Sequence, residues 1–397
     1  EEDAAIREAW QRYRDGGESG VKMQCLVTGK EDEIAAVHPS VKGVRDAQSS
    51  GAALVSFNAP AFCSYGREQN YNAPVGKYAA FAYTAALNHL LADSDHVQHI
   101  DDAYPGFFSA VIGGGTYGGL SDNDLRAALK RLANGLPCDD LGVDPNRPFY
   151  ILGLAPNAAR LSVRFFLRDS FGKLMENVNA HYARLEIAGA KYSILPLWAL
   201  LNATVRDPKK QVPSPVVSGA TVRAVFSGAR YPASLLEAVM LRIRAERDIT
   251  WGKAAIIKAY YLKNPHEDCP KEVLTVSLNE ASTNPAYTLG RLFSVYEAVQ
   301  QAANPGINAT IKDKYFNSAA AMPASIFPVL NNLCQKHLRK LDARQRVYYD
   351  KQIMKLKGVL NENYPARMTL AQQGSFDLGY YHQTQKRYTK KEEKENV

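Results

Sequence analysis

The chain has 397 residues, 46% of them hydrophobic and 22% charged, which excludes a disordered protein and favours a globular one of two domains. Its formal net charge of +8 indicates a polyanionic partner such as nucleic acid. Five widely spaced cysteines exclude a disulfide scaffold and favour the reducing cytoplasm, and the longest apolar run, 192–201, is too short to cross a membrane.

The first part of the chain, residues 1–206, is predicted to be an α+β region. An initial helix is followed by short strands, for which the β-branched runs at 23–29 and 51–57 are the best candidates. The further elements expected here, in chain order, are helices at 77–92 and 121–135, strands at 150–154 and 161–167, and a helix ending near residue 187. Because the sequence does not begin with methionine, we expect additional residues upstream of Glu1.

The second part of the chain is predicted to be a helical bundle over residues 220–397. Residues 207–219, which are rich in Lys, Pro and Ser, predict a linker or an exposed loop in front of it. Periodic apolar segments joined by short connections predict helices within 231–248, 284–306, 324–342 and 344–365. From residue 385 onward the charges are mixed and no apolar face is present, so we expect this tail to fray.

The sequence offers little support for bond-breaking chemistry. The glycine-rich segment 113–119 is not followed by the Lys and Ser or Thr of a phosphate-binding loop. His residues stand beside carboxylates at 99–103 and 266–270 without the paired spacing of a metal site, and Cys25 with His38 would supply only half of one. We therefore expect no metal, no cofactor and no catalytic residue. A nuclease or nucleotide hydrolase stays an alternative, as does a purely architectural protein that contacts only phosphates.

Amides and aromatic rings dominate residues 56–76. The side chains concerned are Asn58, Gln69, Asn70 and Asn72 with Phe57, Phe62, Tyr65 and Tyr71. Amides can bond to the acceptors of A·T pairs in the minor groove or to unpaired base edges, and aromatic rings can stack on bases. An Asn-rich turn held by packed rings explains the same composition equally well. The candidate base contacts are Asn58, Tyr65, Gln69, Asn70 and Asn72, with Arg67 and Lys77 as contacts to the DNA backbone.

The excess of positive charge lies in residues 330–397, which contain fourteen Lys or Arg and seven Asp or Glu. Helical spacing places Lys336, Arg339, Lys340 and Arg344 on one face of one helix, and Lys351 with Lys355 on one face of the next. These faces lack acidic residues, so we predict that they bind phosphates, with an ordinary solvated surface as the alternative. Further candidates for backbone contacts are Arg160 and Arg164, alternate residues of one strand, and Lys209 and Lys210 in the predicted linker.

Long blocks of the sequence also resemble one known family. They include SSGAALVSFNAPAFCSYG from residue 49, LAPNAARLSVRFFLRDSFGKLMENVNAHYARLEI from 154, NPAYTLGRLFSVYEAVQQAANPGINATIKDKYF from 284 and FDLGYYHQTQ from 376. In this order, from about Cys25 to Gln385, the chain is similar to the large subunit of the type I-C CRISPR Cascade complex. In that family an α+β region is followed by a helical bundle resembling the Cascade small subunit.

The resemblance implies a non-catalytic DNA-binding subunit of an RNA-guided complex in antiviral defence. Such a subunit recognises the protospacer-adjacent motif on duplex DNA, helps to unwind the duplex, holds the displaced strand of the R-loop and helps to recruit the CRISPR helicase-nuclease. The implied partners are target DNA, guide RNA within the complex, and other Cascade subunits, including the backbone and small subunits. Guide pairing then supplies the remaining sequence specificity.

Overall fold

The computed structural model describes residues 20–44, 46–93, 97–99, 109–114, 145–146, 148–192, 194–361 and 363–395, with the isolated residues Ala5 and Ala9. The helices predicted at the start of the chain and at 121–135 lie outside these residues, as do most of 99–103 and 113–119. The chain divides into two compact units, residues 1–114 with 150–166, and residues 115–149 with 167–397. The predicted α+β fold class is confirmed.

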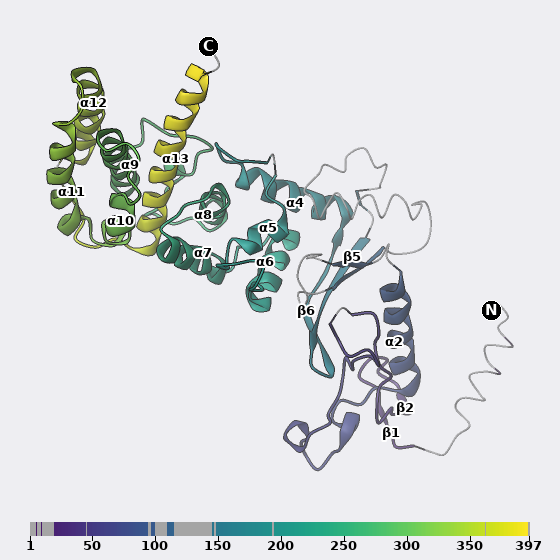
Figure 1. The fold of residues 1–397 in the computed structure, drawn as a ribbon. Helices are drawn as coiled ribbons and strands as arrows, with labels where there is room; N and C mark the ends of the chain where they lie inside the picture. The colour runs from purple at the N-terminus through teal and green to yellow at the C-terminus, as the bar shows by residue number, and fades with distance from the viewer. Residues whose placement is uncertain are drawn as a thin grey trace. The chain divides into compact units, whose positions relative to one another are not determined.

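The described strands form two sheets. β1 (Lys22–Gln24) pairs antiparallel with β2 (Glu31–Glu33), with Lys22 opposite Glu33. A four-stranded sheet has the order β3 (Val97–His99), β4 (Ser109–Gly114), β5 (Pro148–Asn157) and β6 (Arg160–Ser170). β5 and β6 are the two long strands drawn beside α2 (Lys77–Ala92) in Figure 1. They confirm the strands and the helix predicted at these places.

The predicted strand at 51–57 is wrong, although its apolar residues are used in the first unit. Ala52 and Ala53 form only isolated bridges, to Val41 and to Arg160 respectively, so no continuous ladder of hydrogen bonds arises. Ala52 lies instead in a small core with Val41, Leu91 and other residues of this unit. The apolar composition of the segment therefore reflects the burial of residues such as Ala52 and not the pairing of a strand.

The second unit consists mainly of helices. Their bounds are α4 (Phe171–Leu185), α5 (Leu197–Asn202), α6 (Pro215–Ser227), α7 (Ala233–Glu246), α8 (Trp251–Lys263), α9 (Pro285–Ala303), α10 (Ile311–Ala321), α11 (Pro323–Leu338), α12 (Ala343–Leu360) and α13 (Leu370–Glu395). The four helices predicted between residues 231 and 365 are confirmed. The fraying expected from residue 385 is wrong, because α13 continues to Glu395.

α9 is the central helix of the bundle in the second unit. Every residue from Ala286 to Val299 is buried, as expected for a helix surrounded on all sides. α13 lies beside it (Figure 1). At their crossing, the carbonyl of Phe376 and the amide of Tyr380 in α13 leave no space for a side chain at Gly290, and the carbonyl of Tyr287 in α9 leaves none at Gly379. Next to this crossing, a core of aromatic rings in edge-to-face contact is formed by Phe293, Phe316, Phe376 and Tyr380.

Within 207–219, residues 207–214 form a mostly exposed loop, one of the two predicted alternatives, whereas 215–219 belong to α6 rather than to a linker. Pro215 occupies the first turn of α6, where its fixed φ and missing N–H are tolerated, and Ser218 and Gly219 are buried. The boundary between the compact units lies elsewhere, so residues 167–206 belong with the helices rather than with the α+β region. Across the described helices, none is both long and apolar enough to span a membrane.

Candidate nucleic-acid interface

The amide-rich and aromatic segment forms an exposed loop of the first unit, which we call the amide loop, residues 58–72. It contains two short 3-10 helices, η1 (Pro60–Phe62) and η2 (Gln69–Asn72), separated by a tight turn. The N–H of Arg67 donates to the carbonyl of Ser64 at 3.0 Å, and the two residues between them both have positive φ, as in a type I′ turn.

Asn72 holds this turn in place. Its Oδ1 accepts from the N–H of Ser64 at 2.8 Å, and its Nδ2 donates to the carbonyls of Arg67 at 3.1 Å and Gln69 at 2.9 Å. Both amide hydrogens are therefore used within the loop. Asn70 is only 2% exposed. For these two residues the structure agrees with the interpretation as an Asn-rich turn rather than with direct base contact.

The other candidate base contacts lie on the surface of the amide loop. Asn58, Tyr65 and Gln69 are exposed, and so is the candidate backbone contact Arg67. Tyr65 is 98% exposed and has φ of 54°, a left-handed conformation in which a bulky side chain is an outlier. This conformation costs about 1–2 kcal/mol relative to a right-handed one. Tyr65 thus contributes neither packing nor favourable backbone geometry to the fold.

Arg160 joins the amide loop to the sheet. It is the first residue of β6, its guanidinium lies 4.2 Å from the centroid of the Phe62 ring, and it donates a hydrogen bond to Oδ1 of Asn58. In the sequence, Asn58 and Arg160 had separate predicted roles, and Phe62 was one of several rings that could stack on bases. The hydrogen bond between Arg160 and Asn58 joins residues 102 positions apart, so no local sequence pattern predicts it. The sequence showed only that an aromatic ring lies close to Pro60 in a loop.

The remaining candidates of the first unit are less available to phosphates. Lys77 forms an ion pair with Glu33. The hydrogen bond from Lys77 lowers the pKa of the Glu33 carboxyl, and burial opposes this shift only in part. Arg164 lies on the same side of β6 as Arg160, and its Nε is buried without a hydrogen-bond partner among the described residues.

The first of the two predicted basic faces is divided between two helices, so its placement on one helix was wrong, whereas Lys351 and Lys355 share α12 as predicted. α11 ends at Leu338, and Asp342 begins α12 by accepting a hydrogen bond from the N–H of Gln345 at 2.8 Å. Three of the predicted cations, Lys336, Arg339 and Lys340, therefore lie at the end of α11 and in the following turn, whereas Arg344, Lys351 and Lys355 belong to α12. All six are exposed.

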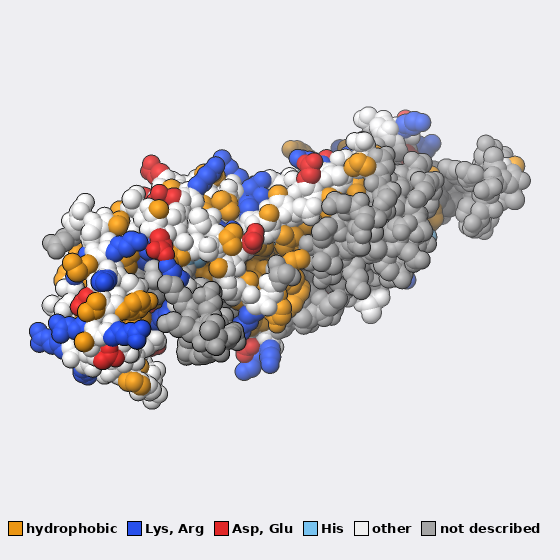
Figure 2. All heavy atoms as spheres, turned by 90° about the horizontal axis from the view of Figure 1, so that it is seen from above, with side chains coloured by type: hydrophobic (Ala, Val, Ile, Leu, Met, Phe, Trp, Pro, Cys, Tyr) orange, Lys and Arg blue, Asp and Glu red, His pale blue; other side chains and the backbone are white. Residues whose placement is uncertain are grey.

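Two of these cations have partners from outside their own helices. Lys340 donates to Oδ1 of Asn304 at 3.1 Å, and Lys355 pairs with Glu280 at 3.3 Å. Part of the positive charge on these helices is therefore neutralised by a carboxylate from a loop that is distant in the sequence. Figure 2 shows Lys and Arg side chains beside exposed hydrophobic ones over the helical bundle, on the left of the view. In the segment before α6, Lys210 lies 3.8 Å from Asp207, and both Lys209 and Lys210 are exposed.

The candidate metal positions do not come together. His266 lies 4.0 Å from Asp268, and Cys269 is buried beside them. Sγ of Cys25 accepts from the N–H of Gly76, whereas His38 bonds to the Tyr83 hydroxyl. Within the part of the chain that the structure describes, no group of three or more His, Cys, Asp or Glu is placed to hold a metal ion.

Comparison with known proteins identifies one family. The profile of the family described as "CRISPR-associated protein (Cas_Csd1)" matches residues 1–388, nearly the whole chain. No curated protein matches the chain significantly.

Proposed function

The chain belongs to the Csd1 family of CRISPR-associated proteins, and from this premise we propose that it is the non-catalytic, DNA-binding large subunit of a Cascade complex. In this role it recognises the protospacer-adjacent motif through the amide loop, helps to open the duplex, and holds the displaced strand on the cations of α11 and α12. Its partners are target DNA, guide RNA, the other Cascade subunits and the helicase-nuclease that it helps to recruit.

The conformation of Tyr65 is the observation that supports this proposal most directly. A fully exposed tyrosine held at positive φ costs stability, and such strained residues cluster at functional sites. An aromatic ring at the tip of a thin loop suits stacking on a base or entering a base step. The ordered turn beneath it, held by Asn72, gives the ring a fixed position before DNA arrives.

The neighbours of Tyr65 supply the other contacts that duplex recognition needs. Arg67 is exposed two residues away and carries the positive charge for a phosphate. The Gln69 amide is exposed and can donate and accept at a base edge. Arg160, held over the Phe62 ring, fixes the other end of the loop through Asn58. We propose that Tyr65 and Gln69 contact bases while Arg67 contacts the backbone.

The test is binding of the assembled complex, with its guide RNA, to matched targets with and without the motif. Tyr65→Gly should reduce the preference for the motif, by about 1–3 kcal/mol if one stacked base is lost. Glycine accepts positive φ, so this variant should fold as stably as the wild type or more stably. Equal loss of binding to both targets would instead favour the architectural alternative.

The enzymatic alternative has its own measurement. The purified chain is incubated with single- and double-stranded DNA and with nucleoside triphosphates, in each case with Mg²⁺ or Mn²⁺. We expect no cleavage and no hydrolysis. Product formation that survives purification to constant specific activity would overturn the non-catalytic assignment.

A further inference from the structure

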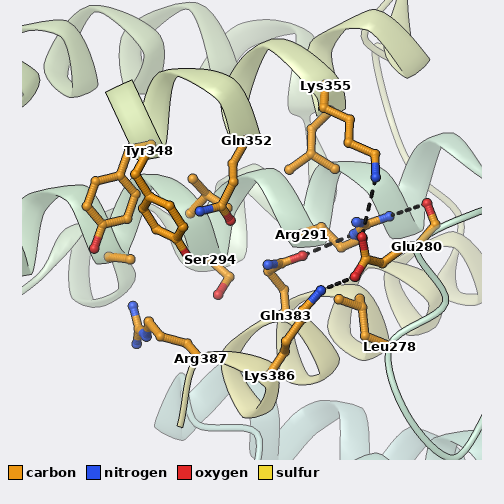
Figure 3. Close-up of a pocket in the computed structure, with 14 residues that line it drawn as sticks. Leu278, Glu280, Arg291, Ser294, Tyr348, Gln352, Lys355, Gln383, Lys386 and Arg387 are labelled. Carbon is orange, nitrogen blue, oxygen red and sulfur yellow. Dashed lines mark hydrogen bonds and ion pairs between the residues drawn. The ribbon is translucent and has the colours of Figure 1, made fainter. Parts of the chain in front are cut away.

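A small, strongly cationic pocket lies within the helical unit and shares Lys355 with the residues assigned above. It has a volume of about 250 Å³ and is bordered by α9, α12, α13 and the loop before α9 (Figure 3). Among the described residues, its charged lining consists of Arg291, Lys355, Lys386 and Arg387, with Glu280 as the single carboxylate. Four positive charges against one negative charge give 4 − 1 = +3 around this small volume, which indicates an anionic ligand.

Arg291 lies at the wall of this pocket as a buried cation with no counterion among the residues that the structure describes. Its side chain is 5% exposed, and its guanidinium donates at 3.2 Å to Oε1 of Gln383 and at 3.4 and 3.5 Å to the carbonyls of Asn279 and Glu280. All three acceptors are neutral, and none of the ion pairs found among the described residues includes Arg291. Because a buried charge is costly without an opposite charge, an anion in the pocket would be stabilised.

Glu280 occupies the position that such an anion would take. Its carboxylate bridges two lysines from different helices, Lys355 of α12 at 3.3 Å and Lys386 of α13 (Figure 3). The loop that carries Glu280 is held independently, since Asn279 donates to the carbonyl of Glu272 at 2.9 Å and to the Tyr287 hydroxyl at 3.2 Å. A phosphate can therefore replace the carboxylate between the lysines without unfolding the loop.

The other side of the pocket offers a surface for a flat ring. Figure 3 shows Tyr348 and Arg387 away from Glu280, with Gln352 between them and the cationic side. Tyr348 is 52% exposed, and Arg387 forms no ion pair among the described residues. Nε2 of Gln352 has no hydrogen-bond partner there, so the amide can rotate toward an acceptor. Tyrosine and arginine faces both stack on nucleobases.

We propose that this pocket binds one nucleotide, with its phosphate among Arg291, Lys355 and Lys386 and its base between Tyr348 and Arg387. The volume is slightly below the ~300–1,000 Å³ of pockets for drug-sized ligands, so it admits a single nucleotide unit. The nucleotide is either free in solution or part of a single strand, and the second source rests on the proposed function. Glu280 is then an internal competitor that the phosphate displaces.

The test uses the purified full-length chain and two probes, adenosine monophosphate and a short single-stranded oligonucleotide. Glu280→Gln removes the competing charge and should tighten binding roughly three- to tenfold. Tyr348→Ala should weaken it roughly five- to 100-fold, as expected for the loss of one stacking platform. Both residues are at the surface, so the variants should keep the unfolding temperature of the wild type. Arg346→Ala on the same helix is the control, because Arg346 lies outside the pocket and pairs with Asp350 at 3.8 Å.

The two probes separate the sources of the ligand. A response of both probes to both substitutions supports a site for free nucleotides, and a response of the oligonucleotide alone supports a site for one unit of a strand. If neither substitution changes the affinity for either probe, or if Arg346→Ala weakens binding as much as Tyr348→Ala, the pocket assignment is overturned. The motif preference that depends on Tyr65 is measured separately, so its failure does not affect this result.

Discussion

Gly290 of α9 faces the backbone of Phe376 in α13 without room for a methyl group. A Cβ at Gly290 would lie 2.8 Å from the carbonyl carbon of Phe376, closer than real Cβ contacts. Because the obstacles are backbone atoms of a packed helix, Gly290→Ala must separate the two helices. We expect a loss of about 3 kcal/mol in the free energy of unfolding, measured by chemical denaturation.

A second glycine provides the matched control. Gly358 lies in α12, and a Cβ placed there would meet nothing within 4 Å. Gly358→Ala should therefore raise stability by about 0.5–1 kcal/mol through helix propensity alone. Equal effects of the two substitutions would contradict the close crossing of α9 and α13.

Two buried histidines make stability depend on pH. Burial, followed by the charge of Arg184, lowers the pKa of His181 to about 3, and burial, followed by the charge of Lys258, lowers the pKa of His382 to about 4. Each is neutral in the folded chain but takes up a proton near pH 6.5 when unfolded. Their contribution to stability is therefore complete above pH 6.5 and is lost as the pH falls from 6.5 toward the folded values.

The variant His382→Gln removes one of these two titrating groups, so the contribution of His382 to the pH dependence can be measured. Between pH 6 and 5, the free energy of unfolding of the wild type should fall more steeply than that of the variant, by about 1 kcal/mol per pH unit. The comparison of slopes is needed because burial raises the pKa of Asp377 well above its usual value, which changes stability in the opposite direction. Parallel slopes would show that His382 takes up its proton in the folded chain as well.

Removal of the Asn72 amide should loosen the amide loop without unfolding the protein. Asn72→Ala deletes three hydrogen bonds, so the amide of Ser64 should exchange with solvent at least about tenfold faster, as expected for the loss of about 1.4 kcal/mol of local protection. The amide of Cys25, which donates to Lys30 at 2.8 Å, should be unaffected. Gln69→Ala is the control, since only the backbone carbonyl of Gln69 takes part, and exchange at Ser64 should not change.

The cations at the end of α11 are expected to bind phosphates of a single strand. Replacing Lys336, Arg339 and Lys340 by Gln should reduce the slope of log affinity against log salt by about 0.7 for every phosphate that the variant no longer neutralises. Lys173→Gln serves for comparison, because Lys173 is paired with Glu176 at 2.9 Å on α4. An unchanged slope in the triple variant would identify these residues as an ordinary solvated surface.

Much of the fold could be predicted because its signals are local. Asn284 and Pro285 begin α9 with a side-chain cap and a proline in the first turn, and both were visible in the sequence. The break between α11 and α12 had an equally local signal, Asp342 followed by Gln345, and the two helices were predicted on either side of it. Only Arg344 was assigned to the wrong helix, because its spacing from the preceding basic residues was regular.

The sequence predicted which chemical groups the candidate sites contain, but not which contacts those groups make. The sequence could not decide whether Asn72 contacts bases or its own loop, because an amide serves both purposes and only the hydrogen bonds distinguish them. Contacts between residues that are far apart in the sequence could not be predicted either. Glu280 meets Lys355 and Lys386 across 75 and 106 residues, and no local pattern specifies such a pairing.

The central position of α9 has a consequence for the protein during its synthesis. The ribosome makes α9 before α13, and the residues between them take several seconds to add at ~5–20 residues per second. During that interval the apolar surface of α9 that will meet α13 has nothing to cover it. The nascent bundle therefore exposes an aggregation-prone surface until residues beyond Leu370 leave the exit tunnel and α13 can cover it.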